Sequence, residues 1–105
     1  MFYVYMLECA DGSYYIGSHR GGDLMIRIHE HNLGRYPRAY TFRRRPVTLI
    51  WSEVFPNPDD MVAAERRLKR WSRAKKEAFI RGDMQTLKLL SKSKSAPADA
   101  SKRSS

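Results

Sequence analysis

The feature that most constrains the fold is a pair of strand-like segments, residues 2–9 and 13–18, on either side of Ala10-Asp11-Gly12. Both segments are rich in Tyr, Val, Ile and Met, residue types that suit a pleated, half-buried strand. The short connection contains Asp and Gly, which tolerate the backbone angles of tight turns. The sequence therefore predicts a β-hairpin near the start of the chain.

The geometry of this turn decides which side chains share a face of the hairpin. A two-residue turn places Tyr5 and Tyr15 on opposite faces. A three-residue loop with Gly12 in the left-handed conformation places Leu7 opposite Tyr15, so that Tyr5, Tyr15 and Gly17 share one face. The residues alone leave both geometries open.

Later segments predict one more strand and several helices. A helix is expected over 23–32, because Asp23 can cap its start and Gly34 follows its end. Residues 47–55 are β-branched and aromatic and predict a third strand between two prolines. Between them, the Gly-, Pro- and Arg-rich segment 34–46 is expected to be irregular and exposed.

The helical region is expected to cover residues 60–90. Its first helix, near 61–71, has Asp59-Asp60 as acidic caps and an apolar face of Met61, Ala64, Leu68 and Trp71. Ser72 is expected to cap a second helix through Ile80 that ends at Gly82, and Asp83 a third through about Leu90. The sequence thus predicts an α+β fold, a small three-stranded antiparallel sheet flanked by helices, in a single domain over 1–90.

The segment 91–105 differs from the rest in composition. It contains Ser, Lys, Ala and Pro but no large apolar residue that could be buried, so we expect a disordered tail. Four Lys or Arg and one Asp give it +3 of the chain's net charge of +9. The predicted domain is therefore basic in its own right.

A net charge of +9 favours a polyanionic partner, and DNA is the first candidate. A membrane is not expected, because the chain has no run of 18 apolar residues. Cys9 is the only cysteine, which excludes an intrachain disulfide and a four-ligand zinc cage of cysteines. With no secretory signal at its start, the chain is expected to be a cytoplasmic monomer, and a protein partner is not readable from the sequence.

Basic residues concentrate in two places. The segment 34–46 has five arginines, and the helical region has seven cations within eleven residues. Either set could be an ordinary solvated surface, but this density favours contacts with DNA phosphates, which carry little base specificity. The expected contacts are Arg43, Arg44, Arg45, Arg66, Arg67, Lys69, Arg70, Arg73, Lys75 and Lys76.

One helical stripe mixes apolar and functional residues. Leu24, Arg27, Ile28 and His31 fall at i, i+3, i+4 and i+7 of the helix predicted over 23–32. An arginine in a helix is usually a solvated or ion-paired residue, and a histidine near a helix C-terminus can simply interact with the helix dipole. Their place beside two apolar anchors instead favours a guanidinium and an imidazole that face the sheet.

Two tyrosine-containing triplets, Tyr3-Val4-Tyr5 and Tyr15-Ile16-Gly17, stand in the two strands of the predicted hairpin, and Arg27, the pair His31-Asn32 and Glu65 follow them. With these residues the sequence resembles the GIY-YIG nuclease family, and in particular its small bacterial stand-alone members. The first triplet stands at the position of the family's first motif, the second matches the second motif, and the later residues follow in family order, so that the resemblance covers roughly residues 2–90. It favours the three-residue hairpin loop, because a shared site needs both tyrosines on one face.

The resemblance implies a DNA endonuclease that hydrolyses phosphodiester bonds in repair or processing of DNA. Tyr5, Tyr15, Arg27, His31 and Glu65 would be catalytic: a phenol beside the attacking water, a guanidinium for the phosphate and Glu65 as ligand of Mg²⁺ or Mn²⁺. The two tyrosines could otherwise be ordinary strand aromatics, and Glu65 an ion-pair partner of Lys69.

Departures from the family pattern accompany these matches. Tyr3 and Val4 replace the Gly and Ile of the first triplet, and Ser18 stands where several members have a lysine. No clear equivalent of the late active-site Asn is present, and His19 and Arg20 are the nearest polar candidates. The alternative function is therefore a non-catalytic nucleic-acid-binding module on the same scaffold, using the basic helices with Tyr36 and Tyr40.

Overall fold

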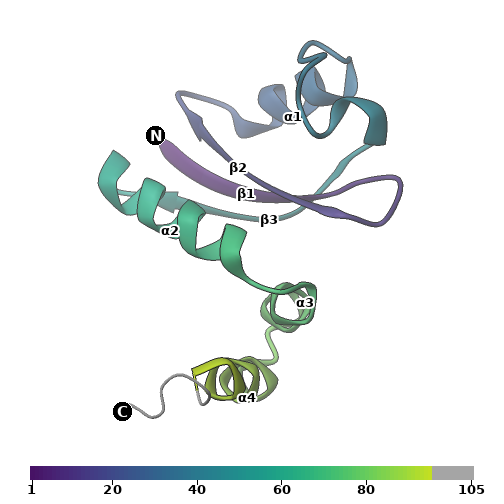
Figure 1. Cartoon of the computed structure of the whole chain (residues 1–105). Helices are drawn as coiled ribbons and strands as arrows, with labels where there is room; N and C mark the ends of the chain where they lie inside the picture. The colour runs from purple at the N-terminus through teal and green to yellow at the C-terminus, as the bar shows by residue number, and fades with distance from the viewer. Residues whose placement is uncertain (96–105) are drawn as a thin grey trace. The chain divides into compact units, whose positions relative to one another are not determined.

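The computed structural model describes residues 1–95 of the 105-residue chain, with side chains through Ser91. The elements in chain order are β1 (Phe2–Glu8), β2 (Tyr14–Arg20), α1 (Leu24–Asn32), a 3-10 turn η1 (Phe42–Arg44), β3 (Thr48–Phe55), α2 (Pro58–Arg70), α3 (Arg73–Arg81) and α4 (Met84–Ser95) (Figure 1). The predicted α+β fold is confirmed.

Met1–Arg70 forms one compact unit, and a second begins at Trp71. The predicted domain extent, 1–90, stays a prediction.

The three strands form an antiparallel sheet in the order β2-β1-β3, with β1 in the centre. In the hairpin, Leu7 pairs with Tyr15 and Tyr5 pairs with Gly17. Gly12 has a φ of 84°, in the left-handed region, and its N–H donates to the Cys9 carbonyl at 2.9 Å. The three-residue loop is therefore confirmed, and Tyr5, Tyr15 and Gly17 share one face.

Both faces of β1 are covered. Tyr5 and Leu7 belong to a core cluster with Leu24 and Ile28 of α1, together with Cys9 and Val47. The alternate residues Val4, Met6 and Ile16 are buried on the other face, and α2, which contacts all three strands, lies on that side of the sheet (Figure 1). The sheet therefore separates α1 from α2.

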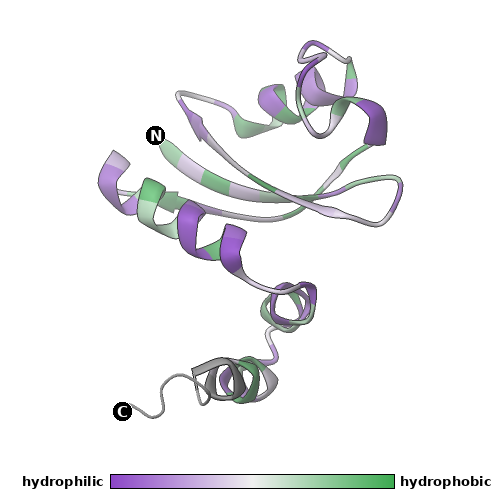
Figure 2. Ribbon diagram, viewed as in Figure 1, coloured by the Kyte–Doolittle hydropathy of each residue, from purple (hydrophilic) through white to green (hydrophobic). Residues whose placement is uncertain are grey.

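Helix α2 begins three residues earlier than expected. The side chain of Asn57 accepts the Asp60 N–H at 2.8 Å, so Asn57 caps the helix and not the predicted Asp59-Asp60. Pro58 occupies the first helical position, where its missing N–H costs no hydrogen bond. The apolar face consists of Met61, Ala64 and Leu68, which are buried, while most of the other residues of the helix are charged (Figure 2). Trp71, predicted on that face, lies just after the helix end.

Capping residues determine where the helices of the second unit begin and end. The Ser72 hydroxyl accepts the Lys75 N–H, and Gly82 ends α3 in the left-handed conformation, both as predicted. Asp83 accepts the Thr86 N–H at 3.1 Å near the start of α4. That helix continues to Ser95, beyond the predicted end near Leu90. The prediction of a disordered tail over 91–105 is therefore wrong for residues 91–95, which are helical, and residues 96–105 lie outside the described residues.

The segment 34–46 is more ordered than its composition suggests. It contains η1, and Thr41 is buried, so the expectation of an irregular, exposed segment is wrong at these residues. Asn32 holds the two ends of the segment together, because its side-chain amide donates to the Val47 carbonyl at 3.0 Å and accepts the Val47 N–H at 2.7 Å. In the part of the chain that the structure describes, no helix is long and apolar enough to cross a membrane.

Candidate active site

Three side chains from different segments are joined by hydrogen bonds on the α1 face of the sheet. The Tyr5 hydroxyl lies 3.1 Å from His31 Nε2, and His31 Nδ1 lies 2.9 Å from the Thr41 hydroxyl. All three residues are buried. Each ring nitrogen of His31 thus has an oxygen partner, and the imidazole links the central strand to the segment 34–46.

Tyr15 and Gly17 of β2 complete this face. The rings of Tyr15 and His31 meet edge to face at a centroid distance of 5.8 Å, and those of Tyr5 and Tyr15 are 6.3 Å apart. A Cβ atom on Gly17 would lie 2.6 Å from the Tyr5 hydroxyl oxygen and 2.8 Å from the Tyr15 ring. Glycine is therefore required at position 17, because the two rings occupy the volume that a side chain would fill.

Arg27 lies beside this group and is held by the segment 34–46. Its Nη1 donates to the Tyr36 hydroxyl at 2.8 Å, and Tyr36 in turn donates to Glu30. The guanidinium carbon also lies 4.8 Å from the centroid of the Tyr36 ring. Within the described residues, the buried Nε of Arg27 has no hydrogen-bond partner. Such an orphaned donor is suited to an oxygen of a ligand.

Burial and neighbouring charges shift the pKa values of the site residues in different directions. Burial, reinforced by Tyr15, raises the pKa of the Tyr5 phenol to about 12, although Arg27 acts in the opposite direction. Burial and the Arg27 cation lower the pKa of His31 below its ordinary value. Burial also acts to lower the pKa of Arg27, but the neighbouring Tyr5 and Tyr36 groups outweigh it and raise that pKa. At neutral pH the site therefore holds a neutral phenol, a neutral imidazole and a cation.

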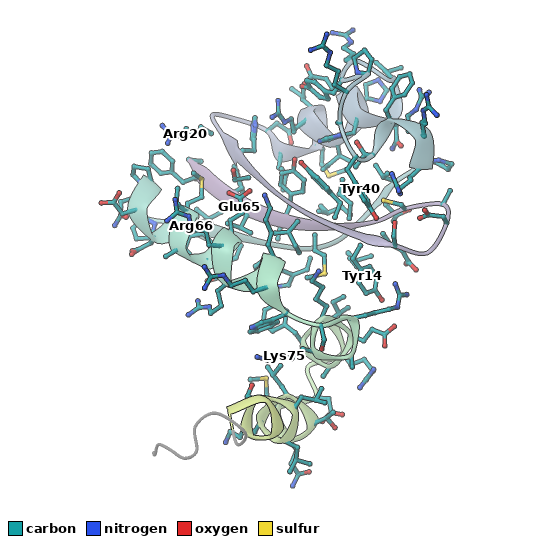
Figure 3. The ribbon with its side chains drawn as sticks, viewed as in Figure 1. Tyr14, Arg20, Tyr40, Glu65, Arg66 and Lys75 are labelled. Carbon is teal, nitrogen blue, oxygen red and sulfur yellow. The ribbon has the colours of Figure 1, made fainter. Side chains whose placement is uncertain are left out.

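Glu65 comes from α2, on the other side of the sheet from α1. Its carboxylate points from the helix toward the strands (Figure 3), and its charge contributes to the raised pKa of Tyr5. The side chain is 19% exposed, and Lys69 Nζ lies 3.0 Å from its Oε2. The structure thus brings Tyr5, Tyr15 and His31 into contact and places Arg27 beside them. Glu65 interacts with Tyr5 through charge and forms the ion pair with Lys69.

The predicted phosphate contacts have different surroundings. Four cations of α2 are exposed, outside its buried face, and Figure 3 labels one of them, Arg66: the four are Arg66, Arg67, Lys69 and Arg70. Arg43 and Arg45 are exposed near η1, whereas Arg44 is half-buried and pairs with Asp11 at 3.1 Å. In the second unit, Arg73 is exposed and pairs with Glu77, Lys75 lies over the Trp71 ring, and Lys76 is half-buried.

Three further residues at the site, Glu30, Tyr36 and Thr41, were not predicted as site residues. Glu30 is the neighbour of His31 in α1, and Tyr36 and Thr41 come from the segment whose composition predicted an exposed loop. Tyr36 was considered only as an exposed contact for nucleic acid. The signal that could have identified Tyr36 and Thr41 is the presence of a polar aromatic and a β-branched residue within an otherwise basic loop, since such residues are often partly buried.

Comparison with known proteins places the chain in a family. A family model described as the GIY-YIG catalytic domain matches residues 1–78. A UPF0213 protein of Streptococcus pneumoniae is 44% identical over 78 residues, 74% of this chain and 76% of that protein. A UPF0213 protein of Halobacterium salinarum is 44% identical over 80 residues, 76% of this chain and 100% of that protein. The UPF0213 protein of Bacillus halodurans, solved in solution by NMR, is 38% identical with a TM-score of 0.48, covering 76% of this chain and 83% of that one.

The matched region contains every residue that carries the resemblance drawn from the sequence, from Tyr3 to Glu65. It covers most of the chain, and the relatives are similar across most of their own length. The chain belongs to the GIY-YIG family.

Proposed function

We propose that this protein is a divalent-metal-dependent DNA endonuclease that hydrolyses phosphodiester bonds in DNA repair or processing. Family membership supports a nuclease, and a net charge of +9 supports DNA as its substrate. The observation that carries the proposal is the contact between the Tyr5 hydroxyl and His31 Nε2 at 3.1 Å, beside the Arg27 guanidinium, whose Nε has no hydrogen-bond partner among the described residues. In this arrangement Tyr5 and His31 would transfer a proton from water, and the neighbouring guanidinium would bind the phosphate.

The proton path follows from the two pKa shifts. A phenol with a pKa of about 12 does not ionise by itself at neutral pH, whereas a neutral imidazole can accept its proton. Water would lose a proton to the Tyr5 oxygen while the Tyr5 proton moves to His31 Nε2. The resulting hydroxide would attack phosphorus as the bond to the leaving sugar oxygen breaks, and that oxygen would take a proton from solvent.

Thr41 determines which nitrogen of His31 is free for this role. If Nδ1–H donates to the Thr41 hydroxyl oxygen at 2.9 Å, Nε2 carries the lone pair that faces Tyr5. Tyr15, packed against both rings, would hold them in this geometry.

Arg27 is suited to the phosphate. Its guanidinium keeps its charge at any physiological pH, because its pKa is raised above an already high value. Tyr36 holds one terminal nitrogen, and the buried Nε lacks a partner within the described residues. A phosphate oxygen would satisfy this donor, and the guanidinium would then stabilise the negative charge that develops during attack.

The acidic residues fit a metal that is held mainly by substrate and water. Among residues 1–95, no three His, Cys, Asp or Glu side chains gather in a cage. Mg²⁺ commonly keeps several waters and needs only one or two carboxylates plus phosphate oxygens, so the partly exposed Glu65 is a sufficient protein ligand. When bound there, Mg²⁺ or Mn²⁺ would supply Lewis-acid stabilisation of the phosphate charge.

Divalent-metal-dependent nicking of DNA by wild type and Glu65→Gln tests the proposal. The amide keeps the size of the side chain but is a poor metal ligand, so cleavage should fall by at least about a hundredfold while DNA binding persists. Glu77→Gln is the matched control, because it makes the same change at a carboxylate that pairs with Arg73 on α3.

Circular dichroism should show all three proteins folded. If Glu65→Gln cuts as fast as wild type, Glu65 is only the ion-pair partner of Lys69. If wild type cuts no branched or linear DNA with any divalent cation, the non-catalytic binding module becomes the better description.

A further inference from the structure

A phenol lies between two oppositely charged side chains of α1. Arg27 and Glu30 are three residues apart, a spacing that makes side chains neighbours on a helix surface and favours an ion pair between them. Among the ion pairs of the described residues, however, none joins Arg27 directly to Glu30. The Tyr36 hydroxyl instead accepts from Arg27 Nη1 at 2.8 Å and donates to Glu30 Oε1. One oxygen atom thus separates the cation from the carboxylate.

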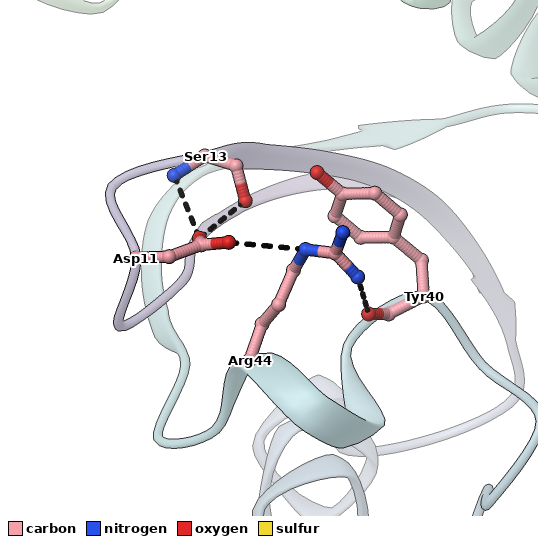
Figure 4. A network of polar contacts seen from close by, with 4 residues as sticks. All are labelled: Asp11, Ser13, Tyr40 and Arg44. Carbon is pink, nitrogen blue, oxygen red and sulfur yellow. Dashed lines mark hydrogen bonds and ion pairs between the residues drawn. The ribbon is translucent and has the colours of Figure 1, made fainter.

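The segment that carries Tyr36 is fixed by further hydrogen bonds. The Tyr36 carbonyl accepts the Ala39 N–H at 2.9 Å. Farther along the segment, Arg44 Nη1 donates to the Tyr40 carbonyl at 2.8 Å, and Arg44 Nε contacts Asp11 of the hairpin turn at 3.1 Å (Figure 4). The phenol is therefore preorganised in its place beside α1.

The hydrogen bond between Tyr36 and Glu30 fixes the direction of the bridge. It lowers the pKa of the Glu30 carboxyl, with smaller contributions from the Arg35 and Arg27 cations, and it raises the pKa of the Tyr36 phenol. At neutral pH a protonated phenol therefore donates to an ionised carboxylate. A hydroxyl has a single hydrogen to donate, so its oxygen faces Arg27 as an acceptor.

This bridge leaves most of the Arg27 guanidinium available. A carboxylate in direct contact commonly takes two N–H groups of a guanidinium and neutralises its charge. The Tyr36 hydroxyl takes one N–H and carries no charge. The buried Nε of Arg27 has no hydrogen-bond partner within the part of the chain that the structure describes. Both the charge and this donor can therefore serve an anion.

We infer that Tyr36 is a spacer that keeps Arg27 from pairing with Glu30, and that Glu30 orients this spacer, so that both are positioning residues for the guanidinium. The inference rests on the proposed function, in which Arg27 binds the scissile phosphate. It has a specific consequence: loss of the Tyr36 hydroxyl is harmful only while the Glu30 carboxylate is present to capture Arg27. If the two residues only stabilised the loop, removal of both would be at least as harmful as removal of one.

The test is a titration with inorganic phosphate in the absence of divalent metal, followed through the Nε–H NMR signal of Arg27. Tyr36→Phe keeps the ring but removes the oxygen, so Arg27 should pair with Glu30 and phosphate affinity should fall about tenfold. In Tyr36→Phe/Glu30→Ala the capturing carboxylate is gone, and affinity should return to within about threefold of wild type. Rates of DNA nicking should follow the same order.

The matched control is Tyr36→Phe/Glu77→Ala. It makes the same change in net charge, but at a carboxylate of α3 that pairs with Arg73. This second substitution should leave the defect of Tyr36→Phe in place. The control therefore separates release of Arg27 from the gain in affinity for anions that any added positive charge gives.

The inference is overturned if Tyr36→Phe binds phosphate like wild type, or if Glu30→Ala does not improve phosphate binding by Tyr36→Phe. A wild-type Arg27 signal that does not respond to phosphate also overturns it. If circular dichroism shows that Tyr36→Phe is unfolded, Tyr36→Leu, which also lacks the oxygen, replaces it in the same series. If neither variant folds, the phenol is required for folding and the spacer role is rejected.

The nicking assay keeps this result apart from the proposed function. Absence of DNA cleavage by wild type would remove the proposed function but not a phosphate response that depends on Tyr36 and Glu30. Cleavage by wild type without the expected recovery in Tyr36→Phe/Glu30→Ala would leave the nuclease proposal intact and remove the spacer role.

Discussion

At the scale of single residues, the site depends on the close approach of Tyr5 to Gly17. Gly17→Ala would insert a methyl group where the Tyr5 hydroxyl and Tyr15 ring now lie. Because Tyr5 is buried and cannot move freely, we expect loss of its contact with His31, a stability loss of roughly 1–3 kcal/mol and at least about tenfold slower cleavage. Thermal melts and nicking rates measure both effects.

The control for this prediction is Gly22→Ala. Gly22 has no neighbouring atom within 4 Å of an added Cβ, so that variant should melt and cut like wild type. Normal cleavage by Gly17→Ala would mean that the Tyr5–His31 contact is dispensable.

Thr41→Val tests how the His31 ring is oriented. Valine keeps the shape of threonine but removes the hydroxyl bonded to Nδ1, so the preference for one ring tautomer should weaken. We expect cleavage to slow by at least about tenfold and the ¹⁵N shifts of the ring to report a mixed tautomer. Thr41→Ser restores the hydroxyl and should restore both. Unchanged ring shifts in Thr41→Val would contradict the role of Thr41.

His31 also predicts the pH dependence of the reaction. A base must be unprotonated, so cleavage should be lost as the pH falls through the His31 pKa, which lies below its ordinary value because of burial and the Arg27 cation. The unfolded imidazole has a pKa of about 6.5, so folding stability should be intact above that pH and decline as the pH falls toward the folded-state pKa. In Arg27→Gln, NMR titration should give a higher His31 pKa. An equal or lower value would show that Arg27 does not act on this imidazole.

At the scale of secondary structure, local sequence signals were sufficient for most of the caps. Asp23, Ser72 and Gly82 each act where the sequence placed them, whereas the three-residue loop at Gly12 was favoured only by the family resemblance. These signals need only a few neighbouring residues, so one sequence suffices to find them. The start of α2 was predicted three residues late because Asp59-Asp60 also suit a helix start, whereas Asn57 is the cap and Pro58 the first helical residue.

The candidate site was predicted less completely than the elements around it. Tyr5, Tyr15, Arg27 and His31 were found through family motifs and helical spacing. Tyr36 and Thr41 were missed because an irregular segment has no periodicity from which burial can be read. Their contacts with α1 depend on how the loop folds back, which no local pattern specifies.

The cap of α2 gives a prediction at this scale. Asn57→Ala removes the side chain that accepts the Asp60 N–H, and we expect a stability loss of about 1 kcal/mol. Asn57→Ser keeps an acceptor at the cap without placing a second carboxylate beside Asp60, and should lie closer to wild type. Chemical denaturation compares the three proteins, and equal midpoints would show that α2 does not depend on this cap.

At the scale of the whole molecule, positive charge should govern affinity for DNA. The exposed cations of α2 are expected to contact phosphates, so affinity should fall steeply as salt concentration rises. Reversal of Arg66, Arg67 and Arg70 to Glu should weaken paired and branched DNA alike and lower the salt slope by about 3. The matching Lys substitutions keep the charge and should retain the slope. A flat salt dependence in wild type would contradict an electrostatic surface.

The two hydrogen bonds from Asn32 to Val47 have a consequence for how relatives of this protein could diverge. These bonds hold the end of α1 next to the start of β3. The residues between them therefore form a loop whose two ends are fixed close together. Replacement of that loop by one of another length would leave the ends of α1 and β3 in place. The residues between Asn32 and Val47 thus form a cassette whose length could vary among relatives, provided that it keeps a hydroxyl for His31 and a phenol for Arg27.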